Sequence, residues 1–283
     1  MCRWLAYAGR PIFIDTLLFQ PCNSLIHQSL SAQRGHVPTN GDGFGLGWYA
    51  ERPRPGLYRD TMPAWNDINL RSLADQIRSP LFFAHVRAST GTATARVNCH
   101  PFRFERWLFM HNGKIGGWRT VRRDLEQLIA PELYAFREGA TDSEVFFYLL
   151  LTNGAQADAA HAFRESVRQV EAVMAAHGVE EPFRMTAALT DGERLVAARH
   201  SSDGASPSLF YATGGDISVD QGSCRFEASR GSVLVLSEPL DGIDAVWREV
   251  PEDRLLFASG GEVELVPFGQ PADAPVRAAT KVS

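Results

Sequence analysis

The chain has 283 residues, 45% of them hydrophobic and 22% charged, with a formal net charge of −5. This composition is typical of a globular protein of one large domain or two small ones, and the scattered lysines and arginines argue against nucleic-acid or membrane-surface binding. Four widely spaced cysteines without a C-x-x-C pair, no signal-peptide pattern and no long apolar run predict a cytoplasmic protein without a zinc site, disulfide framework or membrane span.

The first predicted elements are a strand and two short helices. Residues 2–8 alternate loosely, which puts Cys2 and Trp4 on one face of a strand and Leu5 on the other. Asp15 and Asn23 are favourable N-cap residues, so a short helix is expected after each.

Further strands are predicted before the middle of the chain. A glycine-rich turn leads into residues 44–50, whose glycines tolerate a close backbone approach. Residues 80–90 are apolar and β-prone, and we expect a central strand there. Another strand is expected in residues 105–117, ending in a tight turn at Asn112-Gly113, because an Asn-Gly pair after a strand is typical of turns.

Two helices are predicted next. Thr141 and Glu144 form a capping-box pattern that opens the apolar segment 145–151. A helix that is apolar on every side is expected to lie buried between layers. Residues 162–178 predict an amphipathic helix that Gly178 closes.

The last third of the chain predicts hairpins. Asp191-Gly192 is a strong hairpin turn, and short apolar strands follow it. No internal repeat and no linker divides the chain, so residues 2–268 are expected to form a single domain and residues 269–283 a poorly ordered tail. The order of strands, helices and strands favours packed sheets covered by helices.

Several catalytic patterns are missing from the sequence. It contains no P-loop, no G-x-S-x-G nucleophile elbow and no H-E-x-x-H, and its eight histidines do not pair at metal-ligand spacings. We therefore expect no metal site.

Cys2 follows Met1 directly and has two interpretations. It is either a buried structural cysteine on a strand, which its position alone favours, or a nucleophile. Methionine is normally removed before a small residue, and removal would give Cys2 a free α-amine. Such an amine has a pKa of about 7.7–8.0, so it can take the proton of the thiol, and the resulting thiolate is the attacking species.

Six segments in order then suggest a family. They are MCRW, TNGDGFGLGW (39–48), FFAHVRASTG (82–91), NCHPF (98–102), LFMHNGKI (108–115) and TDSEVFFYLL (141–150). This series resembles the class II glutamine amidotransferases, which are N-terminal nucleophile hydrolases, and the resemblance covers roughly residues 2–265. With no second catalytic domain, the chain is similar to the short stand-alone bacterial branch, which includes γ-glutamyl hydrolases of thiol metabolism.

The resemblance implies an α+β fold, a four-layer αββα sandwich of two mostly antiparallel sheets flanked by helices. It also implies a mechanism without metal or organic cofactor. Cys2 attacks the γ-carbonyl of glutamine or a γ-glutamyl compound and forms a thioester. The side-chain amide of Asn112 and the backbone N–H of Gly113 form the oxyanion hole, where losing one donor typically costs about 10²–10³ in rate.

The same resemblance implies the residues that hold the substrate. Arg87 would bind the α-carboxylate, because a planar guanidinium can donate two parallel hydrogen bonds to a carboxylate. Thr90 and Gly91 would line that pocket. Asp142 would bind the α-ammonium. The residues alone suggest plainer roles, a solvated strand-end ion pair for Arg87 and complementation of a helix dipole for Asp142.

Three histidines, His85, His100 and His111, raise the question of a cysteine–histidine dyad, because Cys99 lies beside His100. Adjacent residues of a strand point to opposite faces, so we do not expect that dyad. His100 and His111 are instead expected to be structural hydrogen-bonding residues. Trp48, Trp107 and Trp118 are expected in the core or in a pocket wall.

One departure leaves the substrate open. Ammonia-channelling synthases of the family usually carry R-W-A-T-H-G, whereas this chain has RASTG from Arg87. Three hypotheses follow: a self-contained γ-glutamyl amide hydrolase, a glutaminase subunit that passes ammonia to a separate synthase, or a catalytically silent binding protein that retains Met1. The expected partner is a small-molecule substrate, and a synthase or a second copy of the chain stays open.

Overall fold

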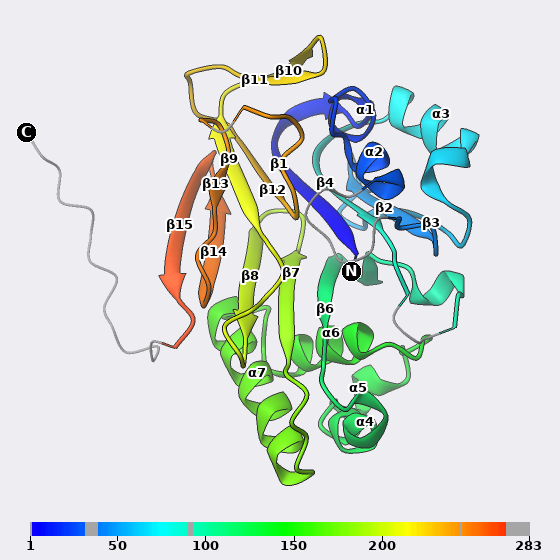
Figure 1. Ribbon diagram of the computed structural model, residues 1–283, viewed down its shortest axis with the longest axis vertical. Helices are drawn as coiled ribbons and strands as arrows, with labels where there is room; N and C mark the ends of the chain where they lie inside the picture. Colours follow the sequence, from blue (N-terminus) through cyan, green and yellow to red (C-terminus); the bar gives the residue numbers. More distant parts are fainter. Residues whose placement is uncertain (1, 32–38, 90–92, 244, 270–283) are drawn as a thin grey trace, which may run out of the picture.

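Two sheets form the centre of the molecule in the computed structural model, which describes residues 2–31, 39–89, 93–243 and 245–269 (Figure 1). The seven-stranded sheet has the order β13 (Arg248–Glu249), β9 (Phe210–Gly214), β12 (Ser232–Leu236), β1 (Arg3–Phe13), β4 (Arg78–Val86), β2 (Phe44–Tyr49) and β3 (Gly56–Asp60). The six-stranded sheet has the order β15 (Glu262–Pro267), β14 (Arg254–Ser259), β8 (Leu195–Ser201), β7 (Arg184–Thr190), β6 (Trp107–Lys114) and β5 (Phe102–Phe104). The pairings within both sheets are antiparallel.

The helices lie on the outer faces of these sheets. The first group is α1 (Asp15–Leu18), α2 (Leu25–Leu30) and α3 (Ile68–Gln76), and the second is α4 (Trp118–Gln127), α5 (Pro131–Tyr134), α6 (Asp142–Thr152) and α7 (Ala159–Ala176). A separate hairpin consists of β10 (Ile217–Asp220) and β11 (Ser223–Phe226). Within the described ranges, no helix has both the length and the apolar character needed to cross a bilayer.

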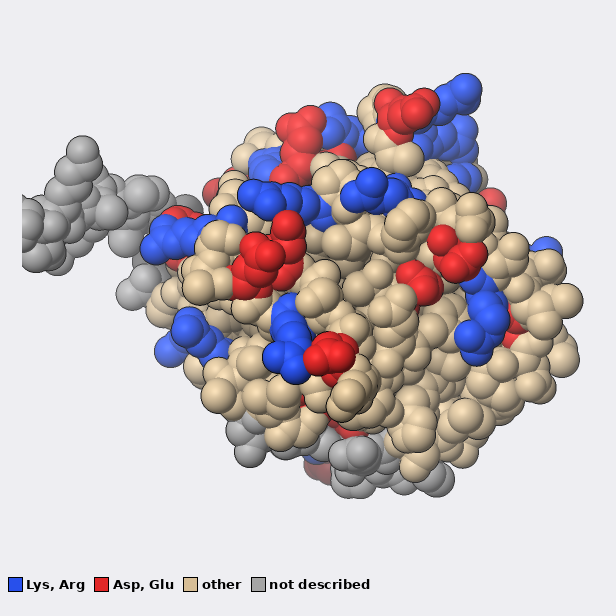
Figure 2. All heavy atoms as spheres, turned by 90° about the horizontal axis from the view of Figure 1, so that it is seen from above, with Lys and Arg blue, Asp and Glu red and all other residues tan. Residues whose placement is uncertain are grey.

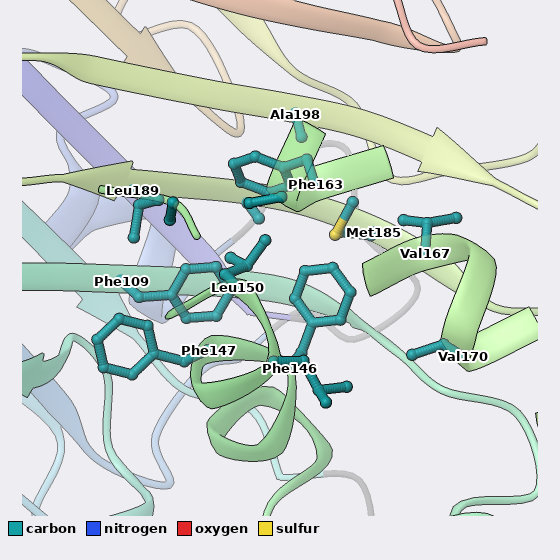
Figure 3. Packing of buried hydrophobic residues seen from close by; sticks show 14 of the residues in the cluster. Phe109, Phe146, Phe147, Leu150, Phe163, Val167, Val170, Met185, Leu189 and Ala198 are labelled. Atoms are coloured by element: carbon teal, nitrogen blue, oxygen red, sulfur yellow. The ribbon is translucent and has the colours of Figure 1, made fainter. Parts of the chain in front are cut away.

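Three buried clusters define four layers. One joins α1–α3 to the seven-stranded sheet, a second fills the space between the sheets, and a third joins the six-stranded sheet to α4–α7. In the third cluster, Phe109 of β6 stacks on Phe147 of α6 with ring centroids 5.4 Å apart (Figure 3). The predicted αββα sandwich is confirmed.

Alternation along β1 decides which side chains enter each layer. Trp4 and Ala6 belong to the cluster between the sheets, whereas Leu5 and Tyr7 pack toward α1–α3. Successive side chains of a strand point to opposite faces, so the predicted faces of this strand are confirmed.

Helix α6 is buried along nearly its whole length, as its apolar sequence predicts. Thr141 caps it and accepts a hydrogen bond from the backbone N–H of Glu144. The Glu144 carboxylate does not complete the predicted capping box. It accepts the backbone N–H groups of Glu138 and Gly139 instead, and so holds the segment that leads into the helix.

The predicted turn at Asn112-Gly113 is wrong. Both residues lie inside β6, where Asn112 pairs with Thr186 and Gly113 with Met185 of β7. Pairing with a distant strand overrides the local turn preference, because each paired residue gains ladder contacts that a turn lacks.

Two predicted N-caps are also shifted by one residue. The cap residue of α1 is Ile14, and α2 begins after Ser24, whose hydroxyl accepts the N–H of His27. Cys99 and His100 follow a 3₁₀ turn (Arg96–Asn98) and are not part of a strand, so the strand-based reason against a dyad is wrong.

Other features of the sequence are confirmed. Gly178 follows α7 with a φ of +62°, and Asp191-Gly192 connects β7 to β8 with Gly192 at +92°. Trp107 is buried, and Trp48 and Trp118 pack against core clusters. The face seen in Figure 2 carries basic and acidic side chains interspersed. The boundaries of the single domain and the tail stay predictions, and residues 270–283 lie outside the described chain.

Candidate active site

Cys2 lies immediately before β1, at one end of the seven-stranded sheet. The antiparallel register pairs Arg3 of β1 with Val86 of β4, so Cys2 and Arg87 lie at the same end of these two neighbouring strands. The thiol of Cys2 lies 3.6 Å from the carbonyl oxygen of Ala88. Because β1 lies between β12 and β4, two hydrogen-bonded neighbours hold the strand that carries the half-buried cysteine.

The surroundings of the thiol act on its ionisation in opposite directions. Burial raises the pKa of Cys2, and the positive charges of Arg87 and Arg3 lower it. The pKa is raised overall, so these two charges do not by themselves create a thiolate. A nucleophile in this place therefore needs a nearby base.

Arg87 is held at the end of β4 by the segment that precedes β2. Its backbone N–H donates to Gly43 O at 2.8 Å, and its guanidinium donates to Asp42 O and Ser89 Oγ, both at 3.3 Å. Only 3% of the residue is exposed, which contradicts the interpretation of Arg87 as a solvated surface arginine. Burial fixes the guanidinium beside Cys2, a geometry that suits carboxylate binding.

Asn112 lies on β6 of the other sheet, on the same face of the strand as Leu108 and Met110, which pack between the sheets. It is buried, and its side-chain nitrogen has no hydrogen-bond partner among the described residues. A buried donor without a partner is costly, so this nitrogen is available for a ligand. Trp4 Nε1 donates to Thr186 Oγ1 at 3.3 Å, and that hydroxyl lies 3.4 Å from Asn112 O, which joins β1 to β6.

Gly113 is required by the close approach of its neighbours. A Cβ at this position would lie 1.9 Å from Arg184 O and 2.6 Å from His111 Nε2. No side chain fits there, so the need for glycine arises from strand packing and not from a turn.

Asp142 ties the start of α6 to the chain that follows β6. Its carboxylate accepts the backbone N–H of Ile115 at 2.9 Å and that of Ser143 at 2.8 Å. The acidic residue thus serves the first turn of the helix, as its plainer interpretation predicts. An ionised carboxylate has about four acceptor positions, so a further donor can still bind.

A pair of histidines was not assigned to the site from the sequence. His85 and His100 are buried and their rings lie 4.3 Å apart between centroids. Their ring nitrogens make no hydrogen bond of standard geometry to described residues, so the expectation that His100 is a hydrogen-bonding residue is wrong. Burial lowers the pKa of His85 to about 3 and that of His100 well below 6.5, which leaves both rings neutral.

His111 matches its expected role. Its Nδ1 lies 2.8 Å from Ser143 Oγ, and this contact joins β6 to the start of α6. Cys99 is buried and its thiol donates to Asp60 O at 3.3 Å. His85 lies two residues after Phe83 in a predicted strand, so the two side chains share one face. That spacing is the signal that could have placed His85 between the sheets.

The structure thus brings most of the predicted site residues toward one end of the sandwich. Cys2 and Arg87 lie at the same end of β1 and β4. Asn112 is joined to β1 through Trp4 and Thr186, and Asp142 is joined to the residue that follows β6. Thr90 and Gly91 lie outside the described residues. Among the residues that are described, no cluster of three or more His, Cys, Asp or Glu could hold a metal ion.

Comparison with known proteins places this geometry in context. The sequence matches the family described as class II glutamine amidotransferases over residues 16–281, a segment that begins after Cys2. It is 33% identical to a probable glutamine amidotransferase, DUG3, of Saccharomyces cerevisiae, over 95% of this chain and 84% of that protein. It is 26% identical to the gamma-glutamyl-hercynylcysteine sulfoxide hydrolase of Mycolicibacterium smegmatis, over 95% of this chain and all of that protein (100%).

Solved structures share the fold. A glutamine aminotransferase class-II domain protein from Silicibacter pomeroyi superposes with a TM-score of 0.71 at 37% identity, over 94% of this chain and 99% of the other. The phosphoribosylpyrophosphate amidotransferase from B. subtilis superposes with a TM-score of 0.64 at 14% identity, over 95% of this chain and 50% of the other. The second likeness concerns the fold alone.

Proposed function

The chain belongs to the class II glutamine amidotransferases, and on that premise we propose that it is a self-contained hydrolase of γ-glutamyl amide bonds. Its substrate is glutamine or a γ-glutamyl compound, and its nucleophile is Cys2 after removal of Met1. The observation that carries the proposal is the position of Cys2 immediately before β1. The buried Arg87 follows the neighbouring strand β4 directly and lies at the same end of the sheet.

The proposed reaction begins with the α-amine of mature Cys2, which takes the proton of its own thiol. The thiolate attacks the γ-carbonyl carbon, and the carbonyl oxygen becomes an oxyanion. The Asn112 amide and the Gly113 N–H donate hydrogen bonds to that oxygen. The orphaned side-chain nitrogen of Asn112 supports this role, because a donor already committed elsewhere cannot stabilise new charge.

The tetrahedral intermediate then collapses. The α-ammonium gives its proton to the leaving nitrogen, the C–N bond breaks, and a γ-glutamyl thioester remains on Cys2. Water adds to the thioester with the amine again accepting a proton, and the S–C bond breaks to release glutamate and restore the thiol. The raised pKa of the thiol supports the need for this base.

The amino-acid end of the substrate is held by two opposite charges in the proposal. Arg87 binds the α-carboxylate with help from Thr90 and Gly91, and Asp142 binds the α-ammonium. The buried, hydrogen-bonded guanidinium supports the first assignment, and the remaining acceptor positions of Asp142 support the second. Binding energy at this end orients the γ-carbonyl toward the thiol.

We favour a γ-glutamyl compound larger than glutamine as the substrate. The RASTG segment departs from the R-W-A-T-H-G of ammonia-channelling synthases. A relative covered over its whole length is named a gamma-glutamyl-hercynylcysteine sulfoxide hydrolase. Comparison of kcat/KM for glutamine with that for γ-glutamylcysteine tests this choice. Equal or higher kcat/KM for glutamine, with ammonia release stimulated by a copurifying protein, would favour a glutaminase subunit instead.

The central experiment combines mass mapping with two variants. Incubation with 6-diazo-5-oxo-norleucine should label Cys2 alone, and intact mass should show loss of Met1. Cys2→Ser and Cys2→Ala should release no measurable glutamate, while Cys22→Ser, which alters an exposed cysteine, should keep the wild-type rate. Label on another cysteine, or full activity of Cys2→Ala, would end the proposal. Retained Met1 with no turnover would support a silent binding protein.

A further inference from the structure

A cavity of about 610 Å³ lies at the open side of the sandwich, and Cys2 is not among the residues that line it. It lies between β3 and β5, which are the edge strands of the two sheets, and α6 contributes to its wall. We call it the edge cavity. Its volume falls within the usual range of small-molecule sites, about 300–1,000 Å³.

Positive charge gathers in the edge cavity. Four arginines line it: Arg54, Arg59, Arg103 and Arg106, the last of which is paired with Glu193 outside the cavity. Arg103 donates to Pro55 O at 3.2 Å, and Arg54 has no hydrogen-bond or ion-pair partner in the described part of the chain. Burial lowers the pKa of Arg103, the charges of Arg54 and Arg59 lower it further, and Glu138 opposes them in part. The guanidinium groups of Arg54, Arg59 and Arg103 therefore repel one another, and a bound anion would relieve that repulsion.

Three acidic residues, Glu105, Glu138 and Glu144, also line the cavity against four arginines, so they offset only part of this charge. Glu144 uses both carboxylate oxygens to accept backbone N–H groups of the segment before α6. Glu138 lies 3.8 Å from Arg59 with its side chain 65% exposed, which makes a weak pair. Arg59 uses another nitrogen to donate to Cys99 O at 3.2 Å. Arg54 and Arg103 keep most of their donors for a ligand.

Aromatic side chains form the apolar part of the wall. Phe104 contacts the ring of Phe136 at 5.1 Å and that of Tyr148 at 6.1 Å between centroids, and Phe102 also lines the cavity. Phe136 is 57% exposed, so it offers an uncovered ring face at the rim. Aromatic rings and guanidinium planes both stack on flat ligands.

We propose that the edge cavity binds a small anion carried on a flat aromatic ring, either a phosphate ester or an aromatic carboxylate. Arg54 and Arg103 hold the anionic group, and Phe104, Phe136 and Tyr148 hold the ring. None of Cys2, Arg87, Asn112, Gly113 and Asp142 lines the edge cavity: Asp142 and Glu144 are two residues apart on α6, about 200° around the helix, and only Glu144 faces it. The inference does not depend on the proposed hydrolase activity.

Isothermal titration calorimetry tests the proposal with AMP and 2-naphthoate as probes. Adenosine and inorganic phosphate serve as the ring and the anion alone. We expect AMP, 2-naphthoate or both to bind at least about tenfold more tightly than adenosine or phosphate, since both parts contribute. Binding of AMP alone identifies a phosphate ester as the ligand class, and binding of 2-naphthoate alone identifies a carboxylate.

Variants locate the binding. Arg54→Gln, at an exposed position, and Arg103→Gln should each weaken binding by about tenfold or more, which corresponds to 1.4 kcal/mol. Arg52→Gln removes an exposed arginine two residues away that does not line the cavity and should change nothing. The proposal is overturned if neither AMP nor 2-naphthoate binds, or if phosphate alone binds as tightly as the better of the two. It is also overturned if both cavity variants bind the probe as tightly as the wild type, or if Arg52→Gln weakens binding as much as they do.

Discussion

The indole nitrogen of Trp4 donates a 3.3 Å hydrogen bond to the hydroxyl of Thr186, and this contact crosses from one sheet to the other. Trp4 lies two residues after Cys2, and Thr186 is the β7 partner of Asn112. The proposed nucleophile and the proposed oxyanion donor therefore depend on the packing of two sheets, not on one continuous segment.

Trp4→Phe should lower kcat about tenfold, because it removes the donor while keeping most of the buried ring area. The lost hydrogen bond should also cost about 1 kcal/mol of unfolding free energy. Urea denaturation and glutamate release measure the two effects. Trp247→Phe removes a comparable hydrogen bond to Asp241, so it should lower the unfolding free energy without changing kcat. Equal kcat in the two variants would contradict the proposed coupling.

Asn112→Ala should lower kcat by about 10²–10³ and leave KM nearly unchanged, as expected for a donor used in the transition state. Stability should change little, because the side-chain nitrogen has no described partner to lose. Asn153→Ala is the matched control: it breaks bonds to Ser166 and Gln169, so stability should fall and kcat should not. An active Asn112→Ala enzyme would remove Asn112 from the mechanism.

Gly113→Ala should destabilise the fold by about 3 kcal/mol, because the new methyl group would overlap the carbonyl oxygen of Arg184. Gly242→Ala, where nothing lies within 4 Å of the added Cβ, should stay within about 0.5 kcal/mol of wild type. Thermal or urea unfolding gives both values. Near-normal stability of Gly113→Ala would mean that this position is not packed as described.

Stability should depend on pH through His85. Its pKa is about 3 in the folded protein and near 6.5 when unfolded, so between these values the unfolded chain binds the extra proton. The stabilisation is full above about pH 6.5 and is lost as pH falls toward 3, by about 1.4 kcal/mol per unit.

His85→Gln should make the pH profile of the unfolding free energy shallower in this window. Urea titrations at several pH values between about 4.5 and 7 measure it. His161→Gln alters an exposed histidine and should leave the slope unchanged. Identical slopes for His85→Gln and wild type would show that the buried ring does not resist protonation.

Arg87→Lys should raise KM about tenfold or more with a smaller change in kcat, because an ammonium cannot bind a carboxylate with two parallel bonds. Steady-state kinetics with a γ-glutamyl substrate and with its α-carboxamide analogue separate the roles. The wild-type enzyme should discriminate strongly between the two, and the variant weakly. Arg10→Lys, in an exposed pair with Asp216, should behave like wild type. Undiminished discrimination by Arg87→Lys would exclude carboxylate binding.

Much of the fold followed from local patterns. Alternation predicted the faces of β1, uniform apolarity predicted the buried α6, and Asp191-Gly192 predicted a hairpin. These signals are local because they reflect the geometry of a single element and the burial of its own side chains. The sequence patterns do not predict strands β3, β5, β10, β11 and β14 or helices α3, α4 and α5, because those patterns are short or mixed.

By itself the sequence determined the kind of protein, since its ordered motifs resemble one family and the family match over residues 16–281 bears out that resemblance. Only the tertiary structure decided that Asn112-Gly113 is strand and not turn, that Arg87 is buried, and that His85 meets His100. It also decided that arginines from β3 and β5 share the edge cavity. Each of these depends on contacts between elements far apart in the chain, and such contacts override local preference because packing and pairing contribute more free energy than a turn propensity.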